Sequence, residues 1–279
     1  MTIPRIVASA VVAAMLAATP LAAQDVTKYV RYAYAGAESY GILEGDQIHA
    51  LRGDLFDSPT RTGRTIALAD ATLLIPVTPS KIIAVGFNYR SHLGDREPDP
   101  YPGLFIKYPT SLIATGESIV FPPGAGNVHY EGEMVLVIGR RARHVSREDA
   151  LDHVFGVTAG NDVSERDWQA GDLQWFRAKA SDTFGPLGPA IVTGLDPDDL
   201  LLQTRLNGEV RQSQRTSDLF FGSAEIISYV SQFVTLEPGD VIYTGTPGET
   251  HAMHPGDVVE IELEGVGILR NTVAGADNR

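Results

Sequence analysis

The amino-acid sequence predicts a mainly β protein of the α+β class, with one large domain and a small appendage. Short apolar segments, many of them alternating, recur along the chain and are followed by turn-forming Gly, Pro, Asn or Asp. Helical periodicity is confined to two or three segments, of which residues 224–233 are the clearest. The length of 279 residues and the hydrophobic content of 43% suit this class.

The composition argues against several functions. The formal net charge is −13 and the sequence pI is about 4.9, which disfavours a nucleic-acid-binding or basic membrane-surface protein. There is no cysteine, so disulfides, thiolate metal ligands and a cysteine nucleophile are excluded. A metal site in this protein would therefore use carboxylate, imidazole or carbonyl ligands.

The first 23 residues have the pattern of a secretory signal peptide. Arg5 precedes an apolar, Ala-rich run from Ile6 to Ala18, and Leu21-Ala22-Ala23 ends in the small residues typical of a cleavage site. We expect Met1–Ala23 to be removed and the mature protein to be periplasmic or secreted, without membrane attachment. The alternatives are an uncleaved anchor, or the ordinary N-terminal helix of a cytoplasmic protein.

Residues 24–75 predict a small N-terminal β domain. Residues 28–34 alternate as a strand does, and residues 40–51 have the pattern of a hairpin turned at Gly45-Asp46. Pro76 and Pro79 mark the boundary with the larger domain, residues 76–279.

An apolar strand at residues 81–86 leads toward His92 and Asp95. In a helical turn these residues stand at positions i and i+3 and can touch. A carboxylate on the imidazole would fix its tautomer and favour its use as a general base. The alternative is a surface pair, since Gly94 weakens the helical interpretation. Lys107 and Ser111, near the end of the next strand, either face the same pocket or form an ordinary strand end and turn.

Glu131 and Glu133 run directly into an apolar strand, residues 134–138. Alternate residues of a strand share a face, so the two carboxylates point the same way, roughly 6–7 Å apart. Val135 and Val137 continue that face into the core. Two like charges beside a core are costly unless a cation neutralises them. A divalent metal ion is one solution, and a solvated edge strand is the other.

Asp162 follows another apolar strand, residues 154–160, and is the natural third ligand. Three carboxylates describe a site for Mg²⁺ or Mn²⁺, with Ca²⁺ as a further option. Lys179 lies in residues 175–189, a segment dense in loop formers, where it either stabilises negative charge or is a surface lysine. A strand beginning at Val241 leads into Gly245 and Thr246, whose turn offers N–H groups and a hydroxyl to an anionic ligand.

Together these segments resemble the fumarylacetoacetate hydrolase family. The likeness spans residues 81–273 and rests on six motifs in the family's order: Gly86–His92, Glu131–Glu133, Gly160–Asp162, Arg177–Pro189, Leu206–Glu209 and Thr244–Pro247. The resemblance implies a mixed β-roll catalytic domain, usually dimeric, with Mg²⁺ or Mn²⁺ on Glu131, Glu133 and Asp162. It implies that Lys179 stabilises an oxyanion and that His92, held by Asp95, is the general base. We expect substrate contacts from Asn88, Tyr89, Lys107, Ser111, Gly245 and Thr246.

Three features depart from the family pattern. Relatives that hydrolyse acylpyruvates carry a His-x-x-Glu pair, whereas the partner here is Asp95. Residues 249–254, with His251 and His254, replace a more usual Gly/Val-rich stretch. The third departure is the predicted signal peptide, since most relatives resemble cytosolic catabolic enzymes.

The expected function is metal-dependent hydrolysis of a C–C bond in a 1,3-diketo acid such as an acylpyruvate or fumarylacetoacetate. If the pair of His92 and Asp95 is ineffective, we expect instead decarboxylation, tautomerisation or isomerisation of a 2-oxo acid. Oxaloacetate and 2-hydroxyhepta-2,4-dienedioate are examples of such substrates. A periplasmic solute-binding protein would suit export, but it has no need of buried carboxylates beside a potential base.

Overall fold

The computed structural model describes residues 26–276, and the predicted signal peptide lies outside this range. The described chain is built mainly from strands, as the sequence predicts, and no described helix is both long and apolar enough to cross a membrane.

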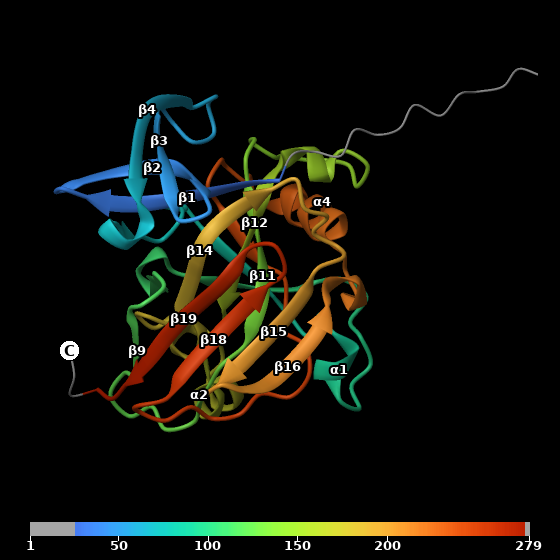
Figure 1. The fold of residues 1–279 in the computed structure, drawn as a ribbon. Helices are drawn as coiled ribbons and strands as arrows, with labels where there is room; N and C mark the ends of the chain where they lie inside the picture. The colour runs from blue at the N-terminus through green and yellow to red at the C-terminus, as the bar shows by residue number, and fades with distance from the viewer. Residues whose placement is uncertain (1–25, 277–279) are drawn as a thin grey trace, which may run out of the picture.

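A twelve-stranded sheet runs through the whole molecule (Figure 1). Its main path contains, in spatial order, β4 (Thr60–Ala67), β3 (Gln47–Arg52), β2 (Ala37–Glu44), β1 (Thr27–Tyr34), β14 (Gly185–Thr193), β12 (Val154–Asn161), β11 (Gly132–Ile138), β17 (Val241–Tyr243), β6 (Ile82–Gly86) and β7 (Gly103–Lys107). Two short strands lie off this path: β5 (Thr72–Leu73) pairs with β1, and β8 (Leu112–Ile113) pairs with β14.

A second sheet covers one face of the first, in front of β11, β12 and β14 in Figure 1. It contains β16 (Glu209–Arg215), β15 (Leu201–Leu206), β18 (Val258–Leu263), β19 (Gly267–Ala274) and β9 (Ser118–Val120). The β15–β16 turn has positive φ at both Asn207 and Gly208, as a type I′ hairpin requires. A separate pair of short strands, β10 (Val128–His129) and β13 (Ser164–Glu165), lies near the site.

The N-terminal strands continue the large sheet. The hairpin predicted at Gly45-Asp46 is present between β2 and β3, and β1 pairs antiparallel with β14, Thr27 opposite Thr193. Residues 26–75 therefore have their own small apolar cluster but share a sheet with the rest of the chain.

The central strand β11 is buried on both faces. Met134, Leu136 and Ile138 belong to the main core, which lies between the two sheets. Val135 and Val137 face a second core cluster on the opposite side, as their alternation predicts. The solvated edge strand considered for Glu131 and Glu133 is therefore wrong, because β11 lies between β12 and β17.

Helices are few and short. The helix predicted at residues 224–233 is α4 (Ser223–Phe233), and the others are α1 (Arg90–Leu93), α2 (Arg166–Gly171) and α3 (Phe176–Ala180). Four single turns of 3-10 helix complete the described elements: η1 (Leu68–Asp70), η2 (Pro109–Ser111), η3 (Ala150–His153) and η4 (Thr216–Asp218). The expectation of a loop over residues 175–189 was wrong, because this segment forms α3 and the first part of β14.

Candidate metal centre

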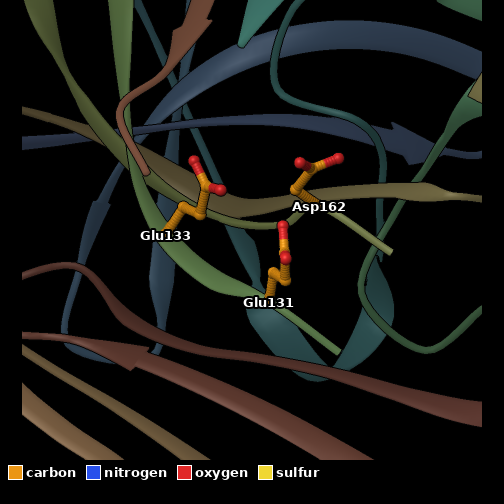
Figure 2. Close-up of side chains that lie close together, drawn as sticks. All are labelled: Glu131, Glu133 and Asp162. Atoms are coloured by element: carbon orange, nitrogen blue, oxygen red, sulfur yellow. The ribbon is translucent and has the colours of Figure 1, made fainter. Parts of the chain in front are cut away.

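Three carboxylates meet in the interior at the end of β11. One oxygen each of Glu131, Glu133 and Asp162 lies within 4.8 Å of the others. All three residues are buried, with exposed fractions of 4%, 1% and 1%. Figure 2 shows the side chains gathered around a common space, two from the β11 segment and one from the end of β12. Within residues 26–276, no other group of three His, Cys, Asp or Glu residues has this spacing.

Local sequence explains why the carboxylates converge. Gly132 lies between the two glutamates and faces the second sheet so closely that a Cβ there would come 2.0 Å from Thr204 Oγ1. Its neighbours must therefore point to the other side. Strand β12 places Asp162 beside them, since the Asp162 N–H donates to the Glu131 carbonyl at 2.8 Å. Asn161 fixes the same junction by accepting from the Glu131 N–H at 2.9 Å.

Three cations lie against this carboxylate group. Lys179 Nζ donates to Glu131 Oε2 and to Asp162 Oδ2, both at 2.6 Å. Lys107 Nζ donates to Asp162 Oδ1 at 2.6 Å, and Arg166 Nη2 donates to Glu131 Oε1 at 2.6 Å. Both lysines are buried, so these ion pairs are shielded from solvent.

Glu133 is the carboxylate without a cation partner in the described chain. It accepts from the Gly245 N–H at 2.6 Å. Burial and the charges of Asp162 and Glu131 raise its pKa well above the usual range. Burial would also raise the pKa of Glu131, but Lys179 and Arg166 outweigh it and hold that pKa well below the usual range.

This donor set fits a hard divalent cation. The converging atoms are carboxylate oxygens, the ligand type that Mg²⁺ and Mn²⁺ prefer. A cation at this point would neutralise the unpaired Glu133 while the existing ion pairs hold the other two carboxylates. Glu131, Glu133 and Asp162 are therefore the residues that would bind it.

His92 faces the carboxylates but lacks the predicted partner. Its Nε2 lies 3.7 Å from Glu131 Oε1, and its Nδ1 lies 2.6 Å from the Gly248 carbonyl oxygen. The prediction that Asp95 holds His92 was wrong. Helix α1 ends at Leu93, Gly94 leaves it with φ +59°, and Asp95 is exposed, with no hydrogen bond or ion pair to His92.

A narrow pocket of about 10 Å³, close to the space of one water molecule, opens beside the carboxylates. Its wall combines a polar side, with His92, Lys179, Thr246 and Gln169, and an aromatic side, with Phe87 and Trp175. The same two aromatic residues line a larger outer hollow of about 340 Å³, which places the outer hollow directly against the pocket. A small polar molecule entering this way would meet the aromatic residues first.

Of the six residues predicted to contact substrate, Thr246 lines this pocket. Three others have fully buried side chains outside the pocket wall, so their contact with substrate stays a prediction. Asn88 bonds to Phe221 and Thr244, and Ser111 donates to the Tyr108 carbonyl at 2.7 Å. The Tyr89 side chain, at the start of α1, is buried without a hydrogen-bond partner. Lys107 and Gly245 do not line the pocket. Lys107 donates a hydrogen bond to Asp162, and the Gly245 N–H donates one to Glu133.

Two residues of the site were missed from the sequence. Arg166 holds Glu131, and its Nη1 donates to Gln169 Oε1 at 2.8 Å. Gln169 lines the pocket, so its amide nitrogen remains as a donor for a ligand. Both lie in the first turns of α2, directly after the third carboxylate, and this proximity to Asp162 was the available signal.

The fold and the buried carboxylate group define an enzyme of the mixed β-roll class. Residues 81–274 match the family described as fumarylacetoacetate (FAA) hydrolase C-terminal, and residues 27–76 match one described as Rv2993c-like, N-terminal. The chain belongs to the fumarylacetoacetate hydrolase family, which confirms the resemblance found in the sequence.

Individual relatives carry different activities in their names. Oxaloacetate tautomerase FAHD2A of Bos taurus is 41% identical over 220 residues, covering 74% of this chain and 70% of that protein. A solved 5-carboxymethyl-2-hydroxymuconate delta-isomerase from Mycobacterium smegmatis is 43% identical, with a TM-score of 0.85 and coverage of 89% of this chain and 99% of that chain. A maleylpyruvate hydrolase from Sphingobium sp. SYK-6, solved with manganese(II) and pyruvate, is 30% identical, with a TM-score of 0.74 and the same coverage.

Proposed function

We propose that the protein is a divalent-metal-dependent tautomerase or isomerase of 2-oxo acids. The observation that carries this proposal is the orientation of His92, whose Nδ1 donates to a backbone carbonyl. In the neutral ring, Nε2 is then an acceptor on the pocket side, beside the carboxylate group. A base held in this way can take a proton from a carbon next to a carbonyl and return it to another position on the substrate.

Similarity to known proteins favours this chemistry over hydrolysis. A proton taken from carbon or from water leaves the same cationic imidazole, and the Glu131 carboxylate lies 3.7 Å from Nε2 in either case, so the geometry of His92 suits both reactions. The higher identity to a tautomerase and an isomerase than to a hydrolase supports the first of them.

The remaining pocket residues suit an anionic substrate. When bound, Mg²⁺ or Mn²⁺ would hold the oxygens of the oxo acid and stabilise negative charge developing on them. Lys179 uses two of its three N–H protons on Glu131 and Asp162, so the third can point to the substrate oxygen. The Thr246 hydroxyl and the Gln169 amide lie on the same polar wall and can hold a carboxylate.

Hydrolysis of a C–C bond in a 1,3-diketo acid is the second candidate. The maleylpyruvate hydrolase with the same fold supports it. In that reaction His92 would take a proton from water, beside the Glu131 carboxylate 3.7 Å from its Nε2.

Solvent deuterium incorporation tests the proposal on a whole class of substrates. Enzyme with Mn²⁺ is incubated in D₂O with oxaloacetate and other 2-oxo dicarboxylic acids, and the products are followed by NMR. We expect accelerated exchange at the carbon next to the 2-oxo group while the carbon skeleton stays intact. Cleavage of a diketo acid without such exchange would favour the second candidate instead.

We also propose that the protein is a homodimer that associates through the edge strand β7 and α3. This surface exposes an unusual number of large apolar side chains: Leu104 (38%), Ile106 (58%), Tyr108 (41%) and Phe176 (63%). Exposed apolar patches of this kind mark association surfaces. Light scattering should give twice the chain mass for the wild type and the chain mass for Ile106→Asp, whereas a monomeric wild type would contradict the proposal.

Export remains a prediction from residues 1–23. It is tested by expressing the full chain in a Gram-negative host and sequencing the N-terminus of the protein recovered from the periplasm. We expect the sequence to begin at Gln24, and recovery of uncleaved cytoplasmic protein would contradict export.

A further inference from the structure

A continuous chain of hydrogen bonds leads from Asn127 to the carboxylate group. The Asn127 Oδ1 to His129 Nε2 distance is 2.8 Å, and His129 Nδ1 lies 2.9 Å from Thr250 Oγ1. Thr250 Oγ1 lies 2.7 Å from Arg166 Nη2, which lies 2.6 Å from Glu131 Oε1. Thr250 belongs to residues 249–254, the stretch that departs from the family pattern.

The two ends of this chain fix the roles of Thr250 and of His129 Nε2. Arginine can only donate, so Thr250 Oγ1 accepts from Arg166, and its own proton is available to His129 Nδ1. At the other end, Asn127 Nδ2 donates to the Asp167 carboxylate at 2.9 Å, which turns the Asn127 oxygen toward His129. His129 Nε2 must then carry the proton. The contacts therefore require a proton at His129 Nε2, and in the neutral ring Nδ1 accepts from the Thr250 hydroxyl.

The backbone fixes the position of His129. His129 forms a β-bridge with Ala252, and the Met253 N–H donates to the Val128 carbonyl at 2.7 Å. Residues 249–254 are thus fixed on β10, with Thr250 held over Arg166.

We propose that His129 and Thr250 are positioning residues that hold Arg166 against Glu131. Arg166 has a long side chain, and its Nη2 meets two acceptors, Thr250 Oγ1 and Glu131 Oε1. With the Thr250 hydroxyl present, the guanidinium lies between two fixed oxygens. Without it, Gln169 and Glu131 are the side chains left to hold the guanidinium, and the Oε1 side of Glu131 is less firmly oriented toward His92. The effect on catalysis rests on the proposed function, whereas the hydrogen-bond arrangement does not.

The tautomer of His129 is a direct readout of this arrangement. Protein labelled with ¹⁵N-histidine is studied by NMR at neutral pH, and the His129→Gln variant identifies the signals of His129 among the seven histidines. We expect a ring that is protonated at Nε2. A ring that is unprotonated at Nε2 would overturn the proposal even if the variant enzymes remained active.

The Thr250 hydroxyl is tested with a pair of substitutions. Thr250→Val keeps the shape of the side chain and removes the hydroxyl, and we expect kcat to fall about tenfold with little change in KM or melting temperature. Thr250→Ser restores the hydroxyl and should stay within about twofold of the wild type. His254→Gln, an exposed position in the same segment, is the matched control and should leave both constants unchanged.

The outcomes of the two experiments are separable. Wild-type kcat in Thr250→Val would overturn the positioning role. If the wild-type protein has no tautomerase or isomerase activity, the proposed function fails. In that case the NMR result, together with the calorimetric Mn²⁺ affinity of Thr250→Val and Thr250→Ser, still decides whether the chain of hydrogen bonds positions Glu131. Equal Mn²⁺ affinity in both variants would then count against it.

Discussion

The Nδ1 atom of His92 lies 2.6 Å from the carbonyl oxygen of Gly248. Because a carbonyl only accepts, Nδ1 carries a proton, and Nε2 faces Glu131 and is an acceptor in the neutral ring. The turn that follows β17 therefore orients the candidate base, in place of a carboxylate at position i+3. A residue from the C-terminal half of the chain thus orients the candidate base, which lies in the first half.

Replacing His92 should remove the reaction but not the cation. We expect His92→Gln to lower kcat for tautomerisation by about 100-fold or more, since a general base commonly contributes that much. Mn²⁺ affinity measured by calorimetry should change little, because His92 is not among the three carboxylate ligands. Asp95→Asn is the matched control and should behave as the wild type. A large loss in Asp95→Asn would restore the dyad that this structure contradicts.

Loss of the carboxylate ligands should abolish metal binding. Glu131→Ala and Glu133→Ala each remove one of the converging oxygens and should leave no measurable Mn²⁺ binding in calorimetry. Glu249→Gln, an exposed position in a neighbouring loop, should bind as the wild type does. Full retention of binding in both alanine variants would refute the assignment of the centre.

Glu133 should make the metal-free protein less stable as the pH rises. Its pKa is raised in the folded state by burial and by Asp162 and Glu131, so between about pH 4.3 and the folded pKa the native state binds more protons than the unfolded chain. Stability therefore falls with increasing pH across this window. Glu133→Gln removes the titration, and its melting temperature in EDTA should decline less steeply from pH 5 to pH 8. Parallel curves for both proteins would contradict this explanation.

Gly132 should tolerate no side chain. An added Cβ would meet Thr204 Oγ1 at 2.0 Å and Ile261 Cδ1 at 3.1 Å, in a core without free space. We expect Gly132→Ala to destabilise the protein by about 1–3 kcal/mol in denaturant unfolding, as overpacking does. Gly171→Ala is the control, because a Cβ there meets nothing within 4 Å. Equal stability of the two variants would contradict the packing described here.

The sequence predicts the carboxylate group well because local rules determine it. Strand alternation places Glu131 and Glu133 on one face, and Asp162 follows a neighbouring apolar strand, so the triad depends on little else. The hairpin at Gly45-Asp46 and the helix α4 were predicted for the same reason. Their signals lie within short segments of the chain.

The contacts of the other residues depend on distant segments. Arg166, Thr250 and His129 meet across 84 and 121 positions of sequence, which no local pattern reveals. Asn88 and Ser111 have the polar side chains expected of a binding site, but the fold uses them to satisfy backbone groups in the interior. Asp95 does not reach the His92 ring, because helix α1 ends at Leu93 and Gly94 follows it in a non-helical conformation.

The most direct test of the proposed function is the conversion of enol oxaloacetate into its keto form, followed by the loss of ultraviolet absorbance of the enol. The wild type with Mn²⁺ should accelerate this conversion in proportion to enzyme concentration, without releasing pyruvate, and both EDTA and His92→Gln should abolish the acceleration. A wild type that, with Mn²⁺ or Mg²⁺, accelerates no enol–keto conversion of oxaloacetate or of related 2-oxo dicarboxylic acids would contradict it.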